Sequence, residues 1–199
     1  MIALLLPPGA FGVEMRDTGQ DIPLHPEEAA LVMGAVEKRR REFALGRACA
    51  RAALAAMGVE AAAIGRDPRG APLWPTGVVG SITHTEGYTC ALVGAAARFS
   101  AMGVDAERVG GVGDELLPRL FDDAERARLM AMDDAQRRIA ATLGFSAKEA
   151  CFKAWGVTFR ELHIEWGDGV FRAECARGAG EGRFVVRDGL ALTAIALPA

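Results

Sequence analysis

The order of helix-like and strand-like patterns along the chain predicts an α+β protein with two similar halves. Each half begins with a strand pattern, continues through a long helix and ends in further strands. The 199 residues suit one domain or two small ones. Hydrophobic residues make up 51% of the chain, which is enough for a buried core. We therefore expect two α/β halves, residues 1–100 and residues 101–199, packed against each other.

Prolines, glycines and first-turn acids mark where the elements of the first half begin and end. Pro7 and Pro8 end an apolar run, and Glu27 and Glu28 mark the first turn of a helix. Gly58 ends a second, longer helical pattern. The expected elements are a strand at 2–6, helices at 26–36 and 38–57, a turn at 68–72, and strands at 78–82 and 89–93.

The second half is expected to open with a strand and to close with an antiparallel meander. Glycine-rich turns separate short alternating segments after Leu162, which is the pattern of strands with one buried face. The expected elements are a strand at 100–109, helices at 116–120, 124–132 and 137–155, and strands at 164–166, 170–173, 183–186 and 190–197.

Composition argues against several classes of protein. The net charge of −3 gives no basic field that would favour nucleic acid. The four cysteines form no CxxC pair, so neither a zinc site nor a redox motif is expected. No apolar run approaches the length of a membrane-spanning helix, and the run at 2–6 is too short for a signal peptide. We expect a cytoplasmic protein without nucleic-acid or membrane partners.

The segment 145–154 gathers opposite charges on one predicted helix. Two of the chain's three lysines, Lys148 and Lys153, lie on either side of Glu149 in sequence. Glu149 and Lys153 are four residues apart and therefore share a helix face. An acid with two flanking cations suits a site for a divalent metal and a phosphate. The alternative is an exposed helix with a simple salt bridge.

A second acidic pair lies in the segment 102–108. In a strand, Asp105 and Glu107 point to one face, and Val104 and Ala106 point to the other, into a core. Two carboxylates on one face repel each other unless a cation lies between them, and oxygen ligands of this kind suit Mg²⁺. The alternative is a solvated strand face with Arg108 as the counter-ion.

Two further segments could bind anions. The turn at 80–85 sets small and hydroxyl residues beside His84, which could donate to a phosphate or simply cap the turn. Arginines follow one stripe of the predicted helix at 38–57, where they could hold phosphates or form a solvated surface. Together these segments give acids, lysines, arginines and a histidine suited to a metal and a polyphosphate. No P-loop, Rossmann fingerprint or catalytic triad accompanies them.

Five segments, taken in order, resemble the motifs of the 4′-phosphopantetheinyl transferases. The similarity is greatest to the monomeric surfactin/enterobactin-synthetase type, and it extends more weakly through the remaining C-terminal residues. Arg69 stands where the family often has lysine, Thr83 and Thr85 replace commoner serines, and Ala106 replaces a bulkier residue. The matching segments are 39–47, 69–75, 80–84, 103–107 and 145–154.

The resemblance implies a pseudo-twofold fold with the active site between the halves. It implies Mg²⁺ (with Mn²⁺ as an alternative), coenzyme A as donor and a serine of an acyl or peptidyl carrier protein as acceptor. The implied metal ligands are Asp105, Glu107 and Glu149. The implied phosphate contacts are Lys148 and Lys153. The implied nucleotide contacts are Thr83, His84, Arg39, Arg47 and Arg69, the arginines chiefly at the 3′-phosphate, with Gly70, Ala71 and Pro72 beside the adenine.

The implied reaction is attack of the serine hydroxyl on the β-phosphate of coenzyme A, with 3′,5′-ADP leaving. Glu149, directly or through a metal-bound water, is the expected base, and Lys153 is expected to stabilise the developing charge. Leu117, Phe121 and Leu129 are expected to contribute to a surface for the carrier protein. Two other classes stay open from the residues alone: a pyrophosphohydrolase, and a module that binds coenzyme A without turnover.

Overall fold

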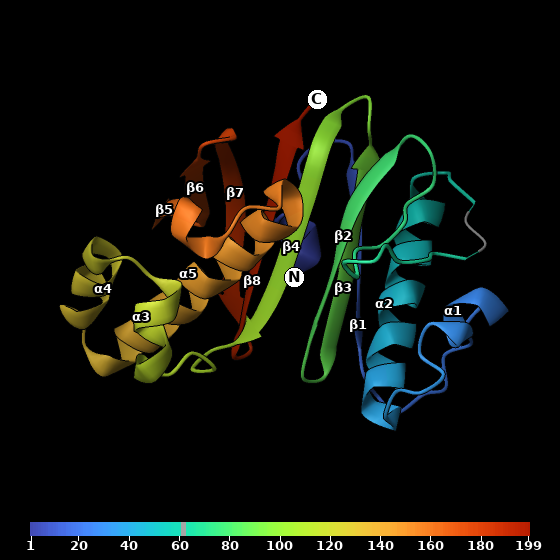
Figure 1. Ribbon diagram of the computed structural model, residues 1–199, viewed down its shortest axis with the longest axis horizontal. Coiled ribbons are helices and arrows are strands. Elements are labelled where there is room, and N and C mark those ends of the chain that lie inside the picture. Colours follow the sequence, from blue (N-terminus) through green and yellow to red (C-terminus); the bar gives the residue numbers. More distant parts are fainter. Residues whose placement is uncertain (61–62) are drawn as a thin grey trace.

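A computed structural model of the chain, which describes residues 1–60 and 63–199, contains two antiparallel sheets side by side (Figure 1). The smaller sheet has the order β1-β3-β2, and the larger has the order β4-β8-β7-β6-β5. The strands are β1 (Ala10–Arg16), β2 (Val78–Thr85), β3 (Tyr88–Ala95), β4 (Phe99–Arg108), β5 (His163–Gly167), β6 (Val170–Cys175), β7 (Gly178–Arg187) and β8 (Leu190–Pro198).

One long helix covers each sheet. Helix α2 (Glu37–Ala56) packs on β1 and β3, and α5 (Asp134–Trp155) packs on β4 and β8. The shorter elements are α1 (Pro26–Ala30), α3 (Leu117–Leu120), α4 (Asp123–Met130), and 3-10 turns η1 (Ile2–Leu4), η2 (Asp114–Leu116) and η3 (Phe159–Glu161). The α+β class with a helix and antiparallel strands in each half is confirmed.

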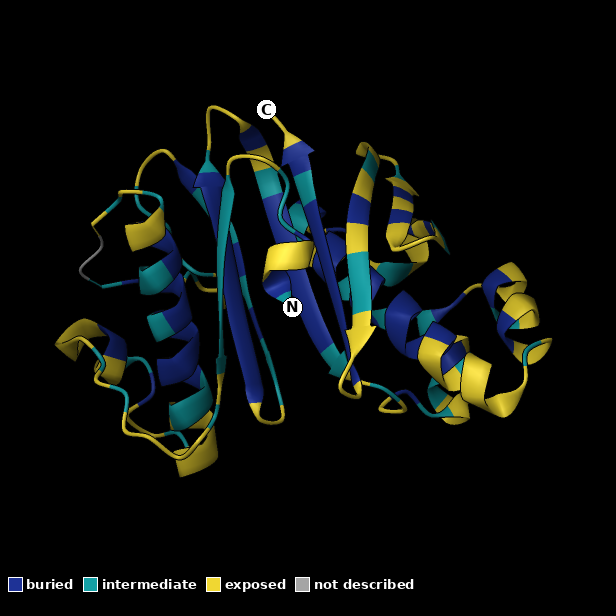
Figure 2. Ribbon diagram, turned by 180° about the vertical axis from the view of Figure 1, so that it is seen from behind, coloured by how far each residue is buried: buried dark blue, intermediate teal, exposed yellow. Residues whose placement is uncertain are grey.

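The two halves share a core. Tyr88 and Leu92 of β3 pack with Val104 of β4 and with Leu190 and Leu192 of β8 in one buried cluster. Figure 2 shows the central strands mostly buried, with exposed residues concentrated in turns and on the outer helix faces. Strand β2 also lies along β4, where the backbone N–H of Val104 donates to Ser81 Oγ at 3.1 Å. The division near residue 100 remains a prediction.

The N-terminus departs from the sequence prediction. Residues 2–6 were expected to form a strand, but Ile2–Leu4 form a 3-10 turn, and the strand of this region is β1. The turn buries Ile2 and Leu5, three residues apart, on one side. Glu14 of β1 fixes it by accepting from the terminal amine at 2.6 Å and from the N–H of Ile2 at 2.7 Å. The first helix also ends earlier than expected, at Ala30.

Candidate active site between α5, β4 and β2

A glycine lets helix α5 approach the edge strand β4. Strand alternation directs Gly103, Asp105 and Glu107 of β4 toward α5, and Val104 and Ala106 join the shared core as expected. A Cβ on Gly103 would meet the carbonyl oxygen of Ala150 at 1.8 Å. Only glycine permits this approach, which brings Lys153 in the last turn of α5 into contact with Asp105.

Lys153 joins α5 to β4 at Asp105. Its Nζ donates to Asp105 Oδ1 at 2.8 Å and to the carbonyl oxygen of Val104 at 2.9 Å. Thr83 of β2 donates its hydroxyl to the same Oδ1 at 3.1 Å. The other carboxylate oxygen of Asp105, Oδ2, is buried and has no hydrogen-bond partner among the residues that the structure describes. A buried, unpartnered carboxylate oxygen is the donor atom that a hard cation would use.

The three predicted metal acids act on one another electrostatically. Burial, followed by the charge of Asp105, raises the pKa of Glu107 to about 7, while Lys153 acts in the opposite direction. Burial and then Asp105 also raise the pKa of Glu149. Within the described residues, no three acids, histidines or cysteines already converge at metal-binding distance. The acid side chains still form a mutually repelling group that a divalent cation would relieve.

Two of the predicted nucleotide-binding residues, Arg39 of α2 and His84 of β2, contact each other at a place separate from Asp105 and Lys153. Arg39 Nη1 lies 2.7 Å from His84 Nε2. Glu42, one helical turn after Arg39, lies beside both: its Oε2 is 3.5 Å from Arg39 Nη1 and 3.6 Å from His84 Nδ1. Burial is the first cause that lowers the pKa of His84, and Arg39 and Lys153 lower it further. The phosphate-binding candidates Arg39 and His84 are therefore brought together.

The turn at 67–72 is held by its own aspartate. Asp67 Oδ1 accepts from the N–H groups of Arg69 at 2.9 Å and Ala71 at 2.8 Å. Gly70 has a φ of +92°, which favours glycine, and Pro72 pairs with Arg66 in an isolated bridge. Arg69, Gly70 and Ala71 are exposed on this turn, as a ligand-contacting loop requires.

Arg47 lies against the residues that lead into this turn. Its Nε donates to the carbonyl of Ile64 at 2.7 Å and its Nη2 donates to that of Gly65 at 3.0 Å. The guanidinium also stacks over the Phe43 ring at 4.3 Å. Burial lowers the pKa of Arg47 to about 10. The structure therefore gives Arg47 a part in shaping the loop, whereas the sequence suggested only a phosphate contact.

Lys148 requires a correction. It was expected to hold phosphates, but its side chain is buried and points away from the acid group. Its Nζ donates to Glu125 Oε2 at 2.7 Å, to the Leu120 carbonyl at 3.0 Å and to the Phe159 carbonyl at 3.3 Å. One residue of helix turns a side chain by about 100°, so Lys148 faces α4 while Glu149 faces the site.

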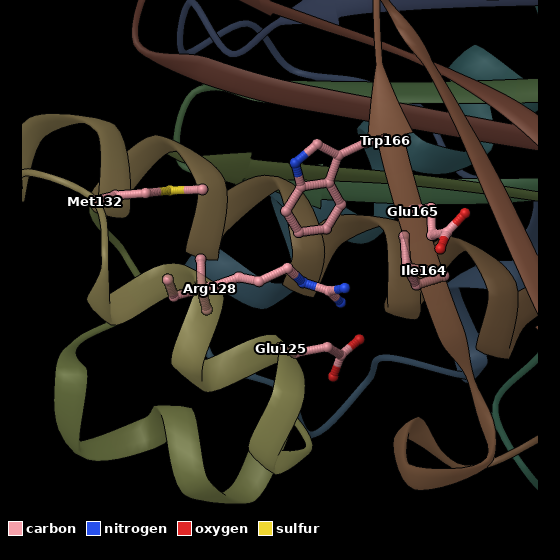
Figure 3. Close-up of a pocket in the computed structure, with 7 residues that line it drawn as sticks. Glu125, Arg128, Met132, Ile164, Glu165 and Trp166 are labelled. Carbon is pink, nitrogen blue, oxygen red and sulfur yellow. The ribbon is translucent and has the colours of Figure 1, made fainter.

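The expected carrier-protein surface also requires a correction. Leu117, Phe121 and Leu129 are buried together under α3 and α4, so they present no apolar surface to a partner. Figure 3 shows the pocket beside them, which has a volume of about 160 Å³ and is lined by Glu125 and Arg128 of α4 and by Ile164, Glu165 and Trp166 of β5. Neither Asp105 nor Lys153 lines this pocket, which is separate from the candidate active site.

Sequence reasoning missed two residues that organise the site. Ser81 was expected only as one of the hydroxyl residues of the anion-binding turn at 80–85, whereas it accepts from the N–H of Val104 and fixes β2 beside β4. Glu42 was not singled out, although its place three residues after Arg39 put the two on one helix face.

No helix in the described part of the chain has the length and apolar character needed to cross a membrane.

Comparison with known proteins matches both halves of the chain. Residues 27–94 match a family model described as the 4′-phosphopantetheinyl transferase N-terminal domain, and residues 101–185 match the 4′-phosphopantetheinyl transferase superfamily. The transferase Npt of Nocardia iowensis is 38% identical, with 98% of this chain and 99% of the relative covered. Svp of Streptomyces mobaraensis is 40% identical over 100% of this chain and 90% of the relative. PptT of Mycobacterium tuberculosis is 40% identical over 81% of this chain and 70% of the relative.

Proposed function

This chain belongs to the 4′-phosphopantetheinyl transferase family, whose members transfer phosphopantetheine from coenzyme A to carrier proteins, and we propose that it does so between α5, β4 and β2. One observation carries this placement. Lys153 and Thr83 converge on Asp105, and the raised pKa values of Glu107 and Glu149 put two further acids in the same electrostatic environment. A cation and a group of acids this close suit a metal and a pyrophosphate.

Asp105, Glu107 and Glu149 would hold Mg²⁺, with Mn²⁺ as the alternative. When bound, the metal would neutralise charge on the pyrophosphate. Two observations support the fit: the buried Asp105 Oδ2 lacks a hydrogen-bond partner among the described residues, and burial followed by the charge of Asp105 raises the pKa values of Glu107 and Glu149. All three supply oxygen ligands, which Mg²⁺ prefers over nitrogen or sulfur.

The chain's own residues would then perform the transfer. Glu149 takes the proton of the carrier serine, directly or through one water, as the serine oxygen attacks the β-phosphorus of coenzyme A. The bond from that phosphorus to the adenosine side breaks, and 3′,5′-ADP leaves. Lys153 donates to the phosphoryl oxygens as their charge grows. A preorganised donor of this kind lowers a barrier by roughly 3–4 kcal/mol.

The nucleotide end would lie along β2 and the turn at 67–72. Arg39, His84 and Arg69 would contact phosphate, and Thr83 would contact the nucleotide next to His84. Gly70, Ala71 and Pro72 would line the adenine. We also propose a monomer, because residues from both halves of one chain build the site. The four free cysteines fit a reducing, cytoplasmic location.

The test is the intact mass of an apo carrier protein after incubation with this protein, coenzyme A and Mg²⁺. We expect a gain of one phosphopantetheine per carrier, abolished by a chelator and restored by excess Mg²⁺. Breakdown of coenzyme A without modification of the carrier would instead identify a hydrolase. Binding of coenzyme A with neither product, across several acyl and peptidyl carriers, would identify a binding module.

A further inference from the structure

A carboxylate lies where the proposed function requires an anion to bind. Glu42 Oε2 is within 3.6 Å of both Arg39 and His84, the two residues proposed to contact the nucleotide phosphate. The Glu42 side chain is only 21% exposed, so solvent screens its charge incompletely. A negative charge at this place should repel phosphate. If phosphate binds here, the Glu42 carboxylate must favour its binding in some other way that outweighs the repulsion.

The hydrogen bond between Arg39 and His84 fixes the state of the imidazole. A guanidinium can only donate, so His84 Nε2 accepts from Arg39 at 2.7 Å and carries no proton. The proton of the neutral ring is therefore on Nδ1, the nitrogen that faces Glu42. Lys153 of α5 and Asp105 of β4 also act on the ring electrostatically, with opposite signs. Burial lowers the pKa of His84 and further favours this neutral form, whereas the charge of Glu42 acts in the opposite direction.

We propose that Glu42 is a positioning residue for the nucleotide phosphate of coenzyme A, acting through His84 on Arg39. The carboxylate favours the His84 tautomer with its proton on Nδ1, which leaves Nε2 free to hold one N–H of Arg39. It also attracts the guanidinium directly. Arg39 is thereby held in place, with its other N–H groups available for the phosphate. His84 orients the arginine in this arrangement, and it need not donate to the phosphate itself.

This inference rests on the proposed function. It predicts that removing the charge of Glu42 raises the KM for coenzyme A, whereas simple repulsion of phosphate by Glu42 predicts that the KM falls. Glu42→Gln keeps the size of the side chain and removes its charge. If Glu42 positions Arg39, the KM for coenzyme A rises by about tenfold while kcat changes little. If Glu42 only repels phosphate, the KM falls. The KM for 3′-dephospho-coenzyme A, which lacks the 3′-phosphate, should stay unchanged and also reports that the variant is folded.

Three comparisons test whether Glu42 acts through His84 and Arg39. Glu37→Gln removes an exposed acid from the first turn of the same helix and should change neither KM. In an Arg39→Ala background, Glu42→Gln should have no further effect on the KM for coenzyme A, because the group it positions is gone. The ¹⁵N NMR shifts of His84, assigned with His84→Asn, should show a proton on Nδ1 that becomes mixed between the two nitrogens in Glu42→Gln.

The possible results separate three failures: of the Glu42 role, of the nucleotide placement and of the proposed function. A KM for coenzyme A that is unchanged or lower in Glu42→Gln overturns the positioning role, even if the enzyme loads carrier normally. If Arg39→Ala and His84→Asn also leave the preference for coenzyme A over its 3′-dephospho form unchanged, the nucleotide placement itself fails, and the Glu42 role fails with it. Absence of carrier loading by the unmutated protein would refute the proposed function instead.

Discussion

Gly103 of β4 lies directly under the carbonyl of Ala150 in α5, where a Cβ would come within 1.8 Å of the carbonyl oxygen. This contact sets the distance between the strand that carries Asp105 and the helix that carries Lys153. The ion pair between those two residues, 2.8 Å long, depends on it. The approach of β4 to α5 therefore determines whether Asp105 and Lys153 can form this ion pair.

Gly103→Ala should separate the strand from the helix. The methyl group forces α5 outward, which should cost about 3 kcal/mol of stability through overpacking. A displacement of about 1 Å at Lys153 and Glu149 should slow transfer roughly 100-fold in the protein that remains folded. Urea unfolding and carrier loading measure the two effects. Gly167→Ala is the matched control, because no atom of the described residues lies within 4 Å of its added Cβ. Equal losses of stability and loading rate in the two variants would contradict this account.

Lys153→Met should remove the donor at the phosphoryl group and leave Asp105 without its cation. We expect a loss of kcat of at least about 100-fold. Coenzyme A binding should weaken far less, because Arg39, His84 and Arg69 remain. Single-turnover loading separates the two quantities. Lys38→Met, which removes an exposed lysine, should load carrier at the normal rate; equal losses in both variants would show that general charge is responsible.

Metal binding should depend on pH through Glu107. Its pKa is raised to about 7 by burial and Asp105, so the folded protein holds this proton up to higher pH than the unfolded chain does. The folded state therefore loses stability as pH rises from about 4.5 to about 7. The loss should be smaller in Glu107→Gln, with the raised pKa of Glu149 responsible for what remains, and thermal unfolding at pH 5 and pH 8 can show this difference.

Added Mg²⁺ should reverse that loss, because the metal needs the deprotonated carboxylate. We expect Mg²⁺ to raise the melting temperature more at pH 8 than at pH 5, and calorimetry to show tighter binding at the higher pH. An equal Mg²⁺ effect at both values, or an effect in Glu107→Gln as large and as pH-dependent as in the unmutated protein, would remove Glu107 from the set of metal ligands.

Lys148 should stabilise the fold without contacting substrate. Lys148→Met leaves Glu125, itself buried, without its cation, which should cost about 3–5 kcal/mol. The double variant Lys148→Met/Glu125→Leu removes both charges and should regain most of the stability and the kcat. Urea unfolding and carrier loading test this pair of effects. A double variant that is stable but inactive would return Lys148 to the phosphate site.

The sequence predicted the site best where spacing alone determines a face. Alternation in β4 placed Asp105 and Glu107 on one side, with Val104 and Ala106 on the other, and the structure shows this arrangement. The helix containing Glu149 and Lys153 also formed as expected. These relationships need only the local period of a strand or helix.

Contacts between distant segments could not be predicted in the same way. Lys148 binds Glu125, which is 23 residues away, and helix spacing does not say what lies opposite a given face. Glu42 meets His84 only because β2 and α2 pack together. Strand β1 was missed because the stronger apolar run at 2–6 lies beside it, and that run forms a buried 3-10 turn.

The most direct test of the account is single-turnover loading of an apo carrier protein by Glu149→Ala at saturating coenzyme A and Mg²⁺. The account places Glu149 both at the metal and next to the serine proton, so the rate should fall by at least about 100-fold. Coenzyme A should still bind, and the melting temperature should not fall. A normal loading rate in this variant would contradict the placement of the reaction at α5 and β4.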